Sequence, residues 1–432
     1  MGKDPEVLTN KAELYYENER YKKAGKYYDS AGDIFFDEEK FQKAQNCYFY
    51  AAKSFIYEEK FDKAIEILRK GGNVSLFMEE FSEALKFFKG TLRYLPSFRD
   101  DEDRNYYYSL FSALTYFCLF IEGKLDQGLE LIKGIKKKVN YEYFKENQFI
   151  NLVKFLAVAI RDNNAKFLQK VRDNFEDYEL LEAELYLLRR VLLLAQINVN
   201  LKILTSFDQE KYTTKDLITL TLKIDTKPLV QILEDTFFKI NVSEIFVDKL
   251  NFDTSDNLTS QNKPDFSKSL PIGDQLSLEY VLKPHFQVDE PYIGPFTLFC
   301  RTDKEDLFIH ELKDVLRLNI VSPPPSLEIS LKNLKPPLIG KSFPLEILIE
   351  NKSEGDALEV ELNVEFPNEL KVTRGTTTKQ IYSLNVNDDM TWQLNLTPME
   401  AGEFEIIMNI KFKDSDGKNI EDVQSFPFEI KL

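Results

Sequence analysis

The chain has 432 residues and a net charge of −16, and 43% of its residues are hydrophobic. At roughly 150 residues per domain, this length predicts two to four domains. The acidic balance argues against nucleic acid as a partner, because binding to phosphates requires a basic surface. The sequence has no apolar run of the ~18 residues that a membrane span needs, so any membrane contact is expected to be peripheral.

The N-terminus and the cysteines predict a cellular location. Residues 1–5 lack the apolar core of a secretory signal peptide. The three cysteines, Cys47, Cys118 and Cys300, are an odd number and show no spacing typical of a metal site. Such cysteine usage favours a reducing compartment. We therefore expect a soluble cytoplasmic protein.

A repeat with a period of 20 residues occupies the first ninety positions. Four units begin with an aromatic residue and have alanine at the fourth place; they start at Tyr21, Phe41, Phe61 and Phe81. In the first three units small residues occupy the eleventh and twelfth places, as in Gly71-Gly72, and we expect this pair to let a neighbouring helix approach closely. A fixed repeat period is among the most diagnostic signs of a repeat architecture.

Each unit has the pattern of one helix. In the first, apolar and small residues fall at positions 24, 27, 28, 31, 32, 35 and 36, which is the spacing of an amphipathic helix. One such helix cannot bury its apolar stripe alone, so we expect successive helices to stack antiparallel into an α-solenoid. A helical bundle with accidental periodicity is the alternative.

Less regular helices follow the repeat. They are predicted over residues 106–121, 125–138, 144–160, 165–175 and 180–198. With the helices of the repeat they make about ten, which end near residue 205. We assign residues 1–205 to one helical repeat domain of the tetratricopeptide type.

From residue 213 the hydrophobic period changes from 3.6 to 2, which indicates strands. In residues 206–322, strands are predicted over 216–224, 238–242, 245–252, 275–282, 294–300, 307–310 and 315–321. A short helix over 214–222 is the alternative for the first. Residues 253–274 are polar and are predicted to form a long surface loop or a partly disordered segment. The pattern predicts an antiparallel sandwich of the immunoglobulin-like type.

Pro323-Pro324-Pro325 predicts a stiff hinge, and residues 323–432 predict a second immunoglobulin-like sandwich. Its strands are expected over 327–331, 345–350, 358–366, 370–373, 379–384, 390–396, 404–412 and 424–430. Asp414-Ser415-Asp416-Gly417 predicts a hairpin turn, and Trp392 is expected to fill the core. The predicted fold is therefore multidomain α + β, an α-solenoid followed by two β-sandwiches.

Over residues 8–200 the helical half resembles the SNAP family. The resemblance lies in the 20-residue step, the Lys-Ala and Ala-Gly pairs of the repeat, and the order of Leu152–Leu156, Asp162-Asn163-Asn164 and Leu187–Val191. This family consists of adaptors that clamp SNARE helical bundles and recruit an AAA+ ATPase. The resemblance implies a helical protein as partner. Recruitment of the ATPase uses a free C-terminal tail in that family, whereas this chain continues for more than two hundred residues.

The second sandwich resembles the β domains of large TRAPP tethering subunits and of adaptor appendages. The segments that resemble them are Pro336–Phe343, Glu350-Asn351-Lys352, Pro398 and Ala401–Phe404. In those TRAPP subunits an α-solenoid also precedes the sandwiches. The resemblance implies that other tethering-complex subunits could be partners.

No pattern in the sequence predicts an enzyme or a cofactor. The two histidines, His285 and His310, stand outside any metal-binding or nucleophile motif. A catalytic histidine needs an oriented partner group, so an enzyme would require a polar pocket around one of them. Structural or surface roles are the predicted alternative.

We therefore predict a non-catalytic adaptor or scaffold of membrane traffic that binds protein partners. The alternative is a structural or assembly subunit that oligomerises through its sandwiches. Candidate partner-binding residues are the basic positions of the helical half: Lys23, Lys43, Lys63, Lys136, Lys137, Arg189 and Arg190. For each lysine, a solvated helix face or helix end is the alternative.

Overall fold

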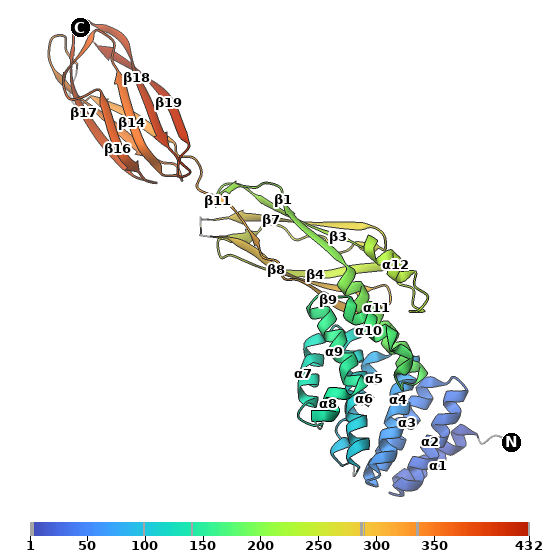
Figure 1. The fold of residues 1–432 in the computed structure, drawn as a ribbon. Helices are drawn as coiled ribbons and strands as arrows, with labels where there is room; N and C mark the ends of the chain where they lie inside the picture. Colours follow the sequence, from blue (N-terminus) through green and yellow to red (C-terminus); the bar gives the residue numbers. More distant parts are fainter. Residues whose placement is uncertain are drawn as a thin grey trace.

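The computed structural model describes residues 4–97, 100–139, 141–285, 288, 290–333 and 337–430. Figure 1 shows three regions in a row: a helical region, a first sandwich and a second sandwich at the far end. This order confirms the predicted α-solenoid followed by antiparallel sheets. Residues 1–3, used in the signal-peptide prediction, and Pro336, part of the TRAPP resemblance, lie outside the described residues. Among the described residues, no helix is both long and apolar enough to cross a membrane.

The repeat forms five helices that each pack on the next: α1 (Pro5–Glu17), α2 (Tyr21–Asp37), α3 (Phe41–Tyr57), α4 (Phe61–Phe77) and α5 (Phe81–Thr91). The turns between them share one geometry, in which a glutamate adopts a positive φ of 56–58°; these are Glu19, Glu39, Glu59 and Glu79. In the second turn, the Lys40 N–H donates to the Phe35 carbonyl at 2.8 Å. This bond closes a Schellman-type helix end, a place where glycine is more usual.

Small residues set the distance between neighbouring helices. A Cβ built on Gly72 would lie 2.3 Å from the Phe88 ring, and one on Gly32 would lie 2.7 Å from the Tyr48 ring. Glycine is therefore required wherever an aromatic side chain of the next helix covers the backbone. This confirms the predicted role of the small pair in close helix packing.

Six further helices complete the helical region: α6 (Asp101–Ile121), α7 (Leu125–Ile135), α8 (Tyr141–Glu146), α9 (Gln148–Arg161), α10 (Lys166–Asp173) and α11 (Glu182–Asn200). The single helix predicted over residues 144–160 is wrong, because two helices meet there. Asn147 separates them, since its side chain accepts hydrogen bonds from the backbone of Phe149 and Ile150 and caps α9.

The first sandwich contains β1 (Lys202–Phe207), β2 (Tyr212–Thr213), β3 (Ile218–Asp225), α12 (Val230–Leu233), β4 (Glu244–Thr254), β5 (Leu258–Ser260), β6 (Ser269–Pro271), β7 (Gln275–Pro284), β8 (Tyr292–Thr302), β9 (Leu307–Leu312), β10 (Leu316–Arg317) and β11 (Ile320–Val321). One sheet has the order β1-β3-β7-β5. The other has the order β10-β8-β4-β6, with β9 also on β8. A two-stranded parallel pair, β11 with β2, lies beside them.

The structure corrects two predictions for this sandwich and adds one strand that was not predicted. No strand forms over residues 238–242, which are described as irregular. The polar segment 253–274 contains the two short strands β5 and β6, which pair with β7 and β4. The strand β1 was not predicted, because it begins two residues after α11 ends and its outward residues include Leu204, which is 49% exposed.

The second sandwich contains β12 (Leu327–Asn333), β13 (Phe343–Asn351), β14 (Ala357–Glu365), β15 (Leu370–Arg374), β16 (Thr378–Leu384), β17 (Asp389–Pro398), β18 (Gly402–Lys413) and β19 (Asn419–Ile430). Its two sheets have the orders β12-β13-β17-β15 and β16-β14-β18-β19. Each predicted strand of this region matches one of these. The turn at Asp414–Gly417 joins β18 to β19, and Trp392 is buried in the core, as predicted.

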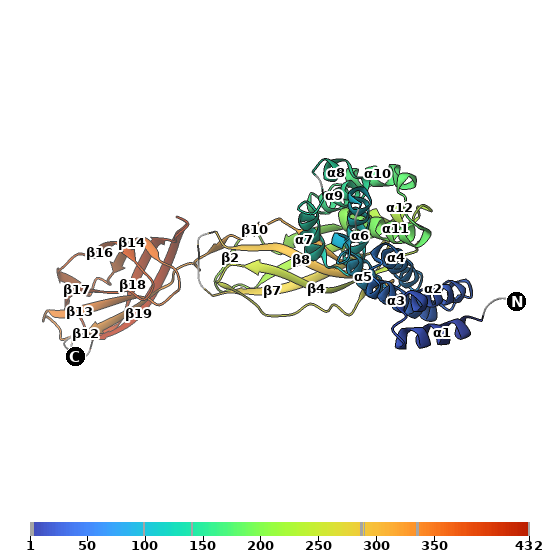
Figure 2. The same cartoon turned by 90° about the horizontal axis from the view of Figure 1, so that it is seen from below.

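The hydrophobic cores do not follow a simple division into three regions. One core runs continuously from Ile65 in α4, through α6, α9 and α11, to Ile320 in the first sandwich. A separate core fills the second sandwich, and another fills the early repeat. Figure 2 shows the same contrast, with the first sandwich directly beside the helices and the second sandwich apart from them.

Candidate functional site

The three predicted repeat lysines occupy equivalent places on the solenoid. The ammonium of Lys23 lies 5.3 Å from the Tyr15 ring centre, that of Lys43 lies 5.5 Å from Phe35, and that of Lys63 lies 6.0 Å from Phe55. In each case the aromatic residue is eight positions earlier, in the preceding helix. All three lysines are exposed, so each combines a cation–π contact within the repeat with access to solvent.

The other predicted residues are dispersed. Lys136 and Lys137 are exposed just after α7. Arg189 is half-buried, with its guanidinium 4.8 Å from the Phe175 ring centre and 5.8 Å from that of Phe237. The Nε of Arg189 is buried and has no hydrogen-bond partner among the described residues. The structure thus groups the repeat lysines on related positions and places Lys136, Lys137 and Arg189 elsewhere.

Arg190 lies at the junction of the repeat with the first sandwich. Its Nε donates to both carboxylate oxygens of Asp306 at 2.8 Å, and another nitrogen of the guanidinium lies 2.8 Å from Glu79. Arg190 also donates to the Lys304 carbonyl at 2.9 Å and covers the Phe81 ring at 4.7 Å. Its side chain is only 2% exposed. In this structure Arg190 therefore binds other parts of the same chain, and its predicted partner-binding role stays a prediction.

Burial and charge act in opposite directions at this junction. Burial raises the pKa of Asp306, and the hydrogen bonds and charge of Arg190 oppose that rise. Burial also opposes ionisation of Glu79, yet the hydrogen bonds from Arg190 and Tyr186 outweigh it and lower the pKa of that carboxyl. Hydrogen bonds between a buried arginine and carboxylates are strong, and breaking them costs free energy because a charge is left buried without its partner. The junction should therefore fix the sandwich against the repeat.

A second buried ion pair holds α4 against α11. Glu184, whose side chain is 0% exposed, accepts from Arg69 at 2.8 and 2.6 Å and from the Asn73 amide at 3.0 Å. The same carboxylate accepts from the backbone N–H of Leu181, which closes the start of α11. One side chain thus caps a helix and joins two helices that are more than 100 residues apart in sequence.

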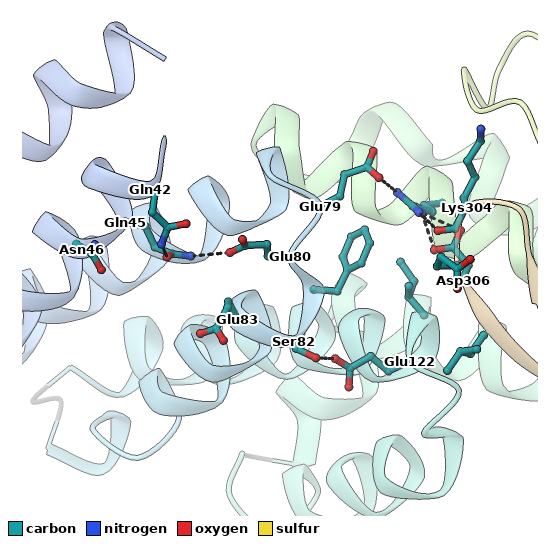
Figure 3. Close-up of a pocket in the computed structure, with 15 residues that line it drawn as sticks. Gln42, Gln45, Asn46, Glu79, Glu80, Ser82, Glu83, Glu122, Lys304 and Asp306 are labelled. Atoms are coloured by element: carbon teal, nitrogen blue, oxygen red, sulfur yellow. Dashed lines mark hydrogen bonds and ion pairs between the residues drawn. The ribbon is translucent and has the colours of Figure 1, made fainter. Parts of the chain in front are cut away.

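A cleft of about 770 Å³ opens beside Arg190. Its walls are the N-terminal parts of α3 and α5, the turn after α6, and the turn between β8 and β9. Its carboxylates come from Glu79, Glu80, Glu83, Glu122, Glu305 and Asp306. Figure 3 shows five of them, Glu79, Glu80, Glu83, Glu122 and Asp306, with Gln45 pointing to Glu80 and Ser82 bonded to Glu122.

None of these acidic residues was among the predicted site residues. For Glu80 and Glu83 the sequence holds a signal, because the matching places of the earlier units are basic: Arg20 and Lys23, Lys40 and Lys43, Lys60 and Lys63. For Glu305 and Asp306 no local signal exists, since these residues join the cleft only through the packing of the sandwich on the helices. Glu122 joins it through the packing of α6 on α5, where it bonds to Ser82.

The histidines lie away from this cleft. His310 is 5% exposed in β9, and its Nδ1 lies 3.0 Å from both the backbone carbonyl and the side-chain oxygen of Asn198. Because both of these atoms are acceptors, Nδ1 must be the protonated nitrogen. His285 is exposed and contacts the Thr259 hydroxyl at 2.8 Å. The described residues include no group of three or more His, Cys, Asp or Glu arranged to hold a metal.

The fold and these contacts define a helical-repeat protein with two appended β-sandwiches. A family model described as "Soluble NSF attachment protein, SNAP" matches residues 5–92, which are the helices α1 to α5. The match covers less than half of the chain, and it supports the SNAP-like nature of the repeat. A search of curated protein sequences gives no significant match.

Solved structures resemble the chain only weakly. The CARDB domain of a Pyrococcus furiosus protein is 16% identical, with 26% of this chain and 94% of that chain covered and a TM-score of 0.20. The Yersinia pseudotuberculosis adhesin InvE is 11% identical, covers 52% of this chain and 60% of its own, and has a TM-score of 0.19. A cohesin module of a Clostridium perfringens family 33 glycoside hydrolase is 14% identical, with 25% and 98% covered and a TM-score of 0.19. TM-scores this low support no inference.

Proposed function

We propose that the chain is a non-catalytic adaptor of intracellular membrane traffic, whose repeat binds a helical protein partner. The observation that supports this most is the SNAP-family match over residues 5–92, on a segment that forms five regularly stacked helices. Stacked helical repeats present extended surfaces that suit partner helices. The sandwiches then provide further docking surfaces, the second of them on a core of its own.

The finer form of the proposal names the partners. By the SNAP resemblance they are a SNARE-type helical bundle and an AAA+ ATPase, and by the TRAPP resemblance they are other tethering-complex subunits. The site of action is the cytoplasm. The exposed repeat lysines Lys23, Lys43 and Lys63 are the candidate contacts for an acidic face of a bundle.

The full chain should be titrated with a purified four-helix SNARE bundle, with binding followed by interferometry. We expect saturable binding that weakens when Lys23, Lys43 and Lys63 are all replaced by glutamate. A matched control changes three exposed lysines of the second sandwich, Lys341, Lys371 and Lys418, by the same charge. Electrostatic contacts at the binding surface lower the affinity in the first variant only.

Two results would count against the proposal. Absence of binding to the bundle, with recovery of no tethering subunit or AAA+ ATPase from a native cytosolic extract, would remove the adaptor. Concentration-dependent mass in sedimentation together with that absence would support the assembly subunit instead. The full chain is needed in these experiments, because a cut at residue 205 would divide the core that the helices share with the first sandwich.

A further inference from the structure

A continuous groove follows the surface between α3 and α5, and we call it the α3–α5 groove. One end is the 770 Å³ cleft at the sandwich junction, and the other is a second hollow of about 360 Å³. The two share the lining residues Gln45, Asn46 and Glu83. The groove extends from Glu80, before α5, to Tyr94, beyond its end. At 1.5 Å per helical residue this is about 20 Å, or four turns of a partner helix.

The end of the groove near Tyr94 is apolar. Its lining includes Phe49, Ile56, Leu68, Phe87 and Tyr94. Phe49 is 50% exposed, although burial of a phenylalanine side chain is favourable. Covering this end with the apolar side chains of a partner would remove that exposed surface from water.

The end of the groove near the sandwich is acidic. Glu79 and Asp306 share one cation, Arg190, while Glu80 faces the Gln45 amide at 3.4 Å rather than a cation of the described residues. Glu122, which pairs with Lys124, approaches from the turn after α6, and Glu305, which pairs with Arg301, approaches from the β8–β9 turn. The lining of this end holds six carboxylates and two cations, Arg190 and Lys304. This end is therefore built by both the repeat and the sandwich, and it has more carboxylates than cations.

The acidic charge is not a by-product of the repeat. In three earlier units the places of Glu80 and Glu83 hold Arg or Lys, so the fourth unit alone changes these two places from two positive to two negative charges. The aromatic residue that contacts the lysine in the earlier units is also absent. Ser75 occupies the place that Tyr15, Phe35 and Phe55 hold eight positions before those lysines. Gln45 donates to the Ser75 hydroxyl at 2.7 Å. The fourth unit thus departs from the repeat at the groove itself.

We propose that the α3–α5 groove binds a basic amphipathic helix of a partner protein, and this rests on the proposed function as a helix-binding adaptor. The partner's apolar residues cover Phe49 and Tyr94, and its Lys or Arg residues lie against Glu79, Glu80 and Glu122. Helix-in-groove recognition uses apolar anchors at i, i+3, i+4 and i+7. The partner's N-terminal end lies at the acidic end of the groove, because the helix dipole places partial positive charge at that end.

The inference is tested with the full chain and a labelled helical peptide of about 16 residues. The peptide has arginines in its N-terminal half and leucines at helical spacing in its C-terminal half, and a second peptide has glutamates in place of the arginines. Fluorescence anisotropy should show saturable binding of the first peptide only. Binding should weaken steeply between about 50 and about 500 mM salt, because screening acts on the acidic end.

The decisive variant is Glu80→Lys with Glu83→Lys, which restores the charges found in the other units and should fold. It is expected to weaken binding by about tenfold or more. Phe49→Ala should weaken it as well. The matched control is Glu13→Lys with Glu17→Lys, which changes the same charge at exposed positions of α1 outside the groove and should leave the affinity unchanged.

Several outcomes would overturn the inference. The arginine peptide does not bind, or the glutamate peptide binds equally well, or the α1 control loses as much affinity as the groove variant. A second copy of the chain that occupies the groove, seen by sedimentation, would also overturn it. If the peptide fails while the SNARE-type bundle still binds and depends on Lys23, Lys43 and Lys63, the groove assignment falls and the adaptor function stands. If both fail, the proposed function falls with it.

Discussion

Arg190 in α11 and Asp306 in the β8–β9 turn meet at 2.8 Å although 116 residues separate them in the sequence. Their side chains are 2% and 3% exposed, and Glu79 of the repeat lies on the other side of the arginine. One buried cation therefore joins three parts of the chain: the α4–α5 turn, the last long helix and the first sandwich. This contact makes the acidic end of the α3–α5 groove a composite of the repeat and the sandwich.

Replacement of Arg190 by alanine should destabilise the protein strongly. Removal of one partner of a buried ion pair leaves an uncompensated charge and costs about 3–5 kcal/mol. Chemical unfolding would measure this loss. Arg161→Ala is the control, because Arg161 pairs with Asp162 at the surface, and this change should leave the unfolding free energy nearly unchanged. An equal effect of the two substitutions would contradict the assigned role of Arg190.

Glu184→Ala should cost about 3–5 kcal/mol as well, because it leaves Arg69 without its bidentate partner and removes the cap of α11. The carboxylate accepts four hydrogen bonds, from Arg69 twice, Asn73 and the Leu181 backbone. Glu184→Gln retains the shape and should lose less, about 1.5–3 kcal/mol. Identical losses for the two variants would contradict this expectation, because they would show that the charge of Glu184 supplies the whole effect and its shape none of it.

Gly72→Ala tests the close packing of the repeat. The new Cβ would lie 2.3 Å from the Phe88 ring, which is fully buried and cannot move away. Overpacking should outweigh the better helix propensity of alanine and destabilise the protein by about 1 kcal/mol or more. Gly90→Ala is the matched control in α5, where nothing lies within 4 Å of the added carbon, and it should stabilise by about 0.5–1 kcal/mol. Thermal unfolding of both variants measures the two changes in stability, and a Gly72→Ala variant as stable as Gly90→Ala would contradict the close packing.

The repeat and the second sandwich could be predicted well because their signals are local. The first three units of 20 residues each contain an apolar stripe, a small pair and a terminating glutamate, and strands of the second sandwich such as β13 alternate between core and solvent. The predictions were wrong at two places where the hydrophobic pattern alone does not decide the structure. Asn147 ends one helix and starts another, and residues 238–242 are apolar enough for a strand yet have no strand to pair with.

The site was harder to predict, for a physical reason. The basic residues Lys23, Lys43 and Lys63 stand out in the sequence, but the composite cleft depends on Glu305 and Asp306, which lie beside the repeat only because the sandwich packs on the helices. Arg190 appears in the sequence as one basic residue of a helix, and nothing near it indicates that Asp306 will bury it. Contacts across more than 100 residues have no periodic signature.

His310 should make the stability of the protein depend on pH. Its buried ring donates from Nδ1 to Asn198, and Asn198 in turn donates to the Ile309 carbonyl at 2.8 Å, so the pair joins β9 to α11. Burial lowers the pKa of His310 below its ordinary value of 6.5. As the pH falls through that value, the unfolded chain takes up a proton on this ring before the folded chain does. Stability is therefore full above about pH 6.5 and decreases below it, because the proton favours the unfolded state.

The unfolding free energy should fall by at most about 1.4 kcal/mol per pH unit from this one group. Measurement by urea unfolding between about pH 7.5 and about pH 5.5 keeps carboxylates with ordinary pKa values ionised, so the histidines dominate the change. The chain has two histidines, which makes the control direct. His310→Gln should flatten the profile, whereas His285→Gln should not, because His285 is exposed. An unchanged slope in the His310 variant would show that other groups cause the dependence, and it would remove His310 as the residue that couples pH to the junction of α11 with the first sandwich.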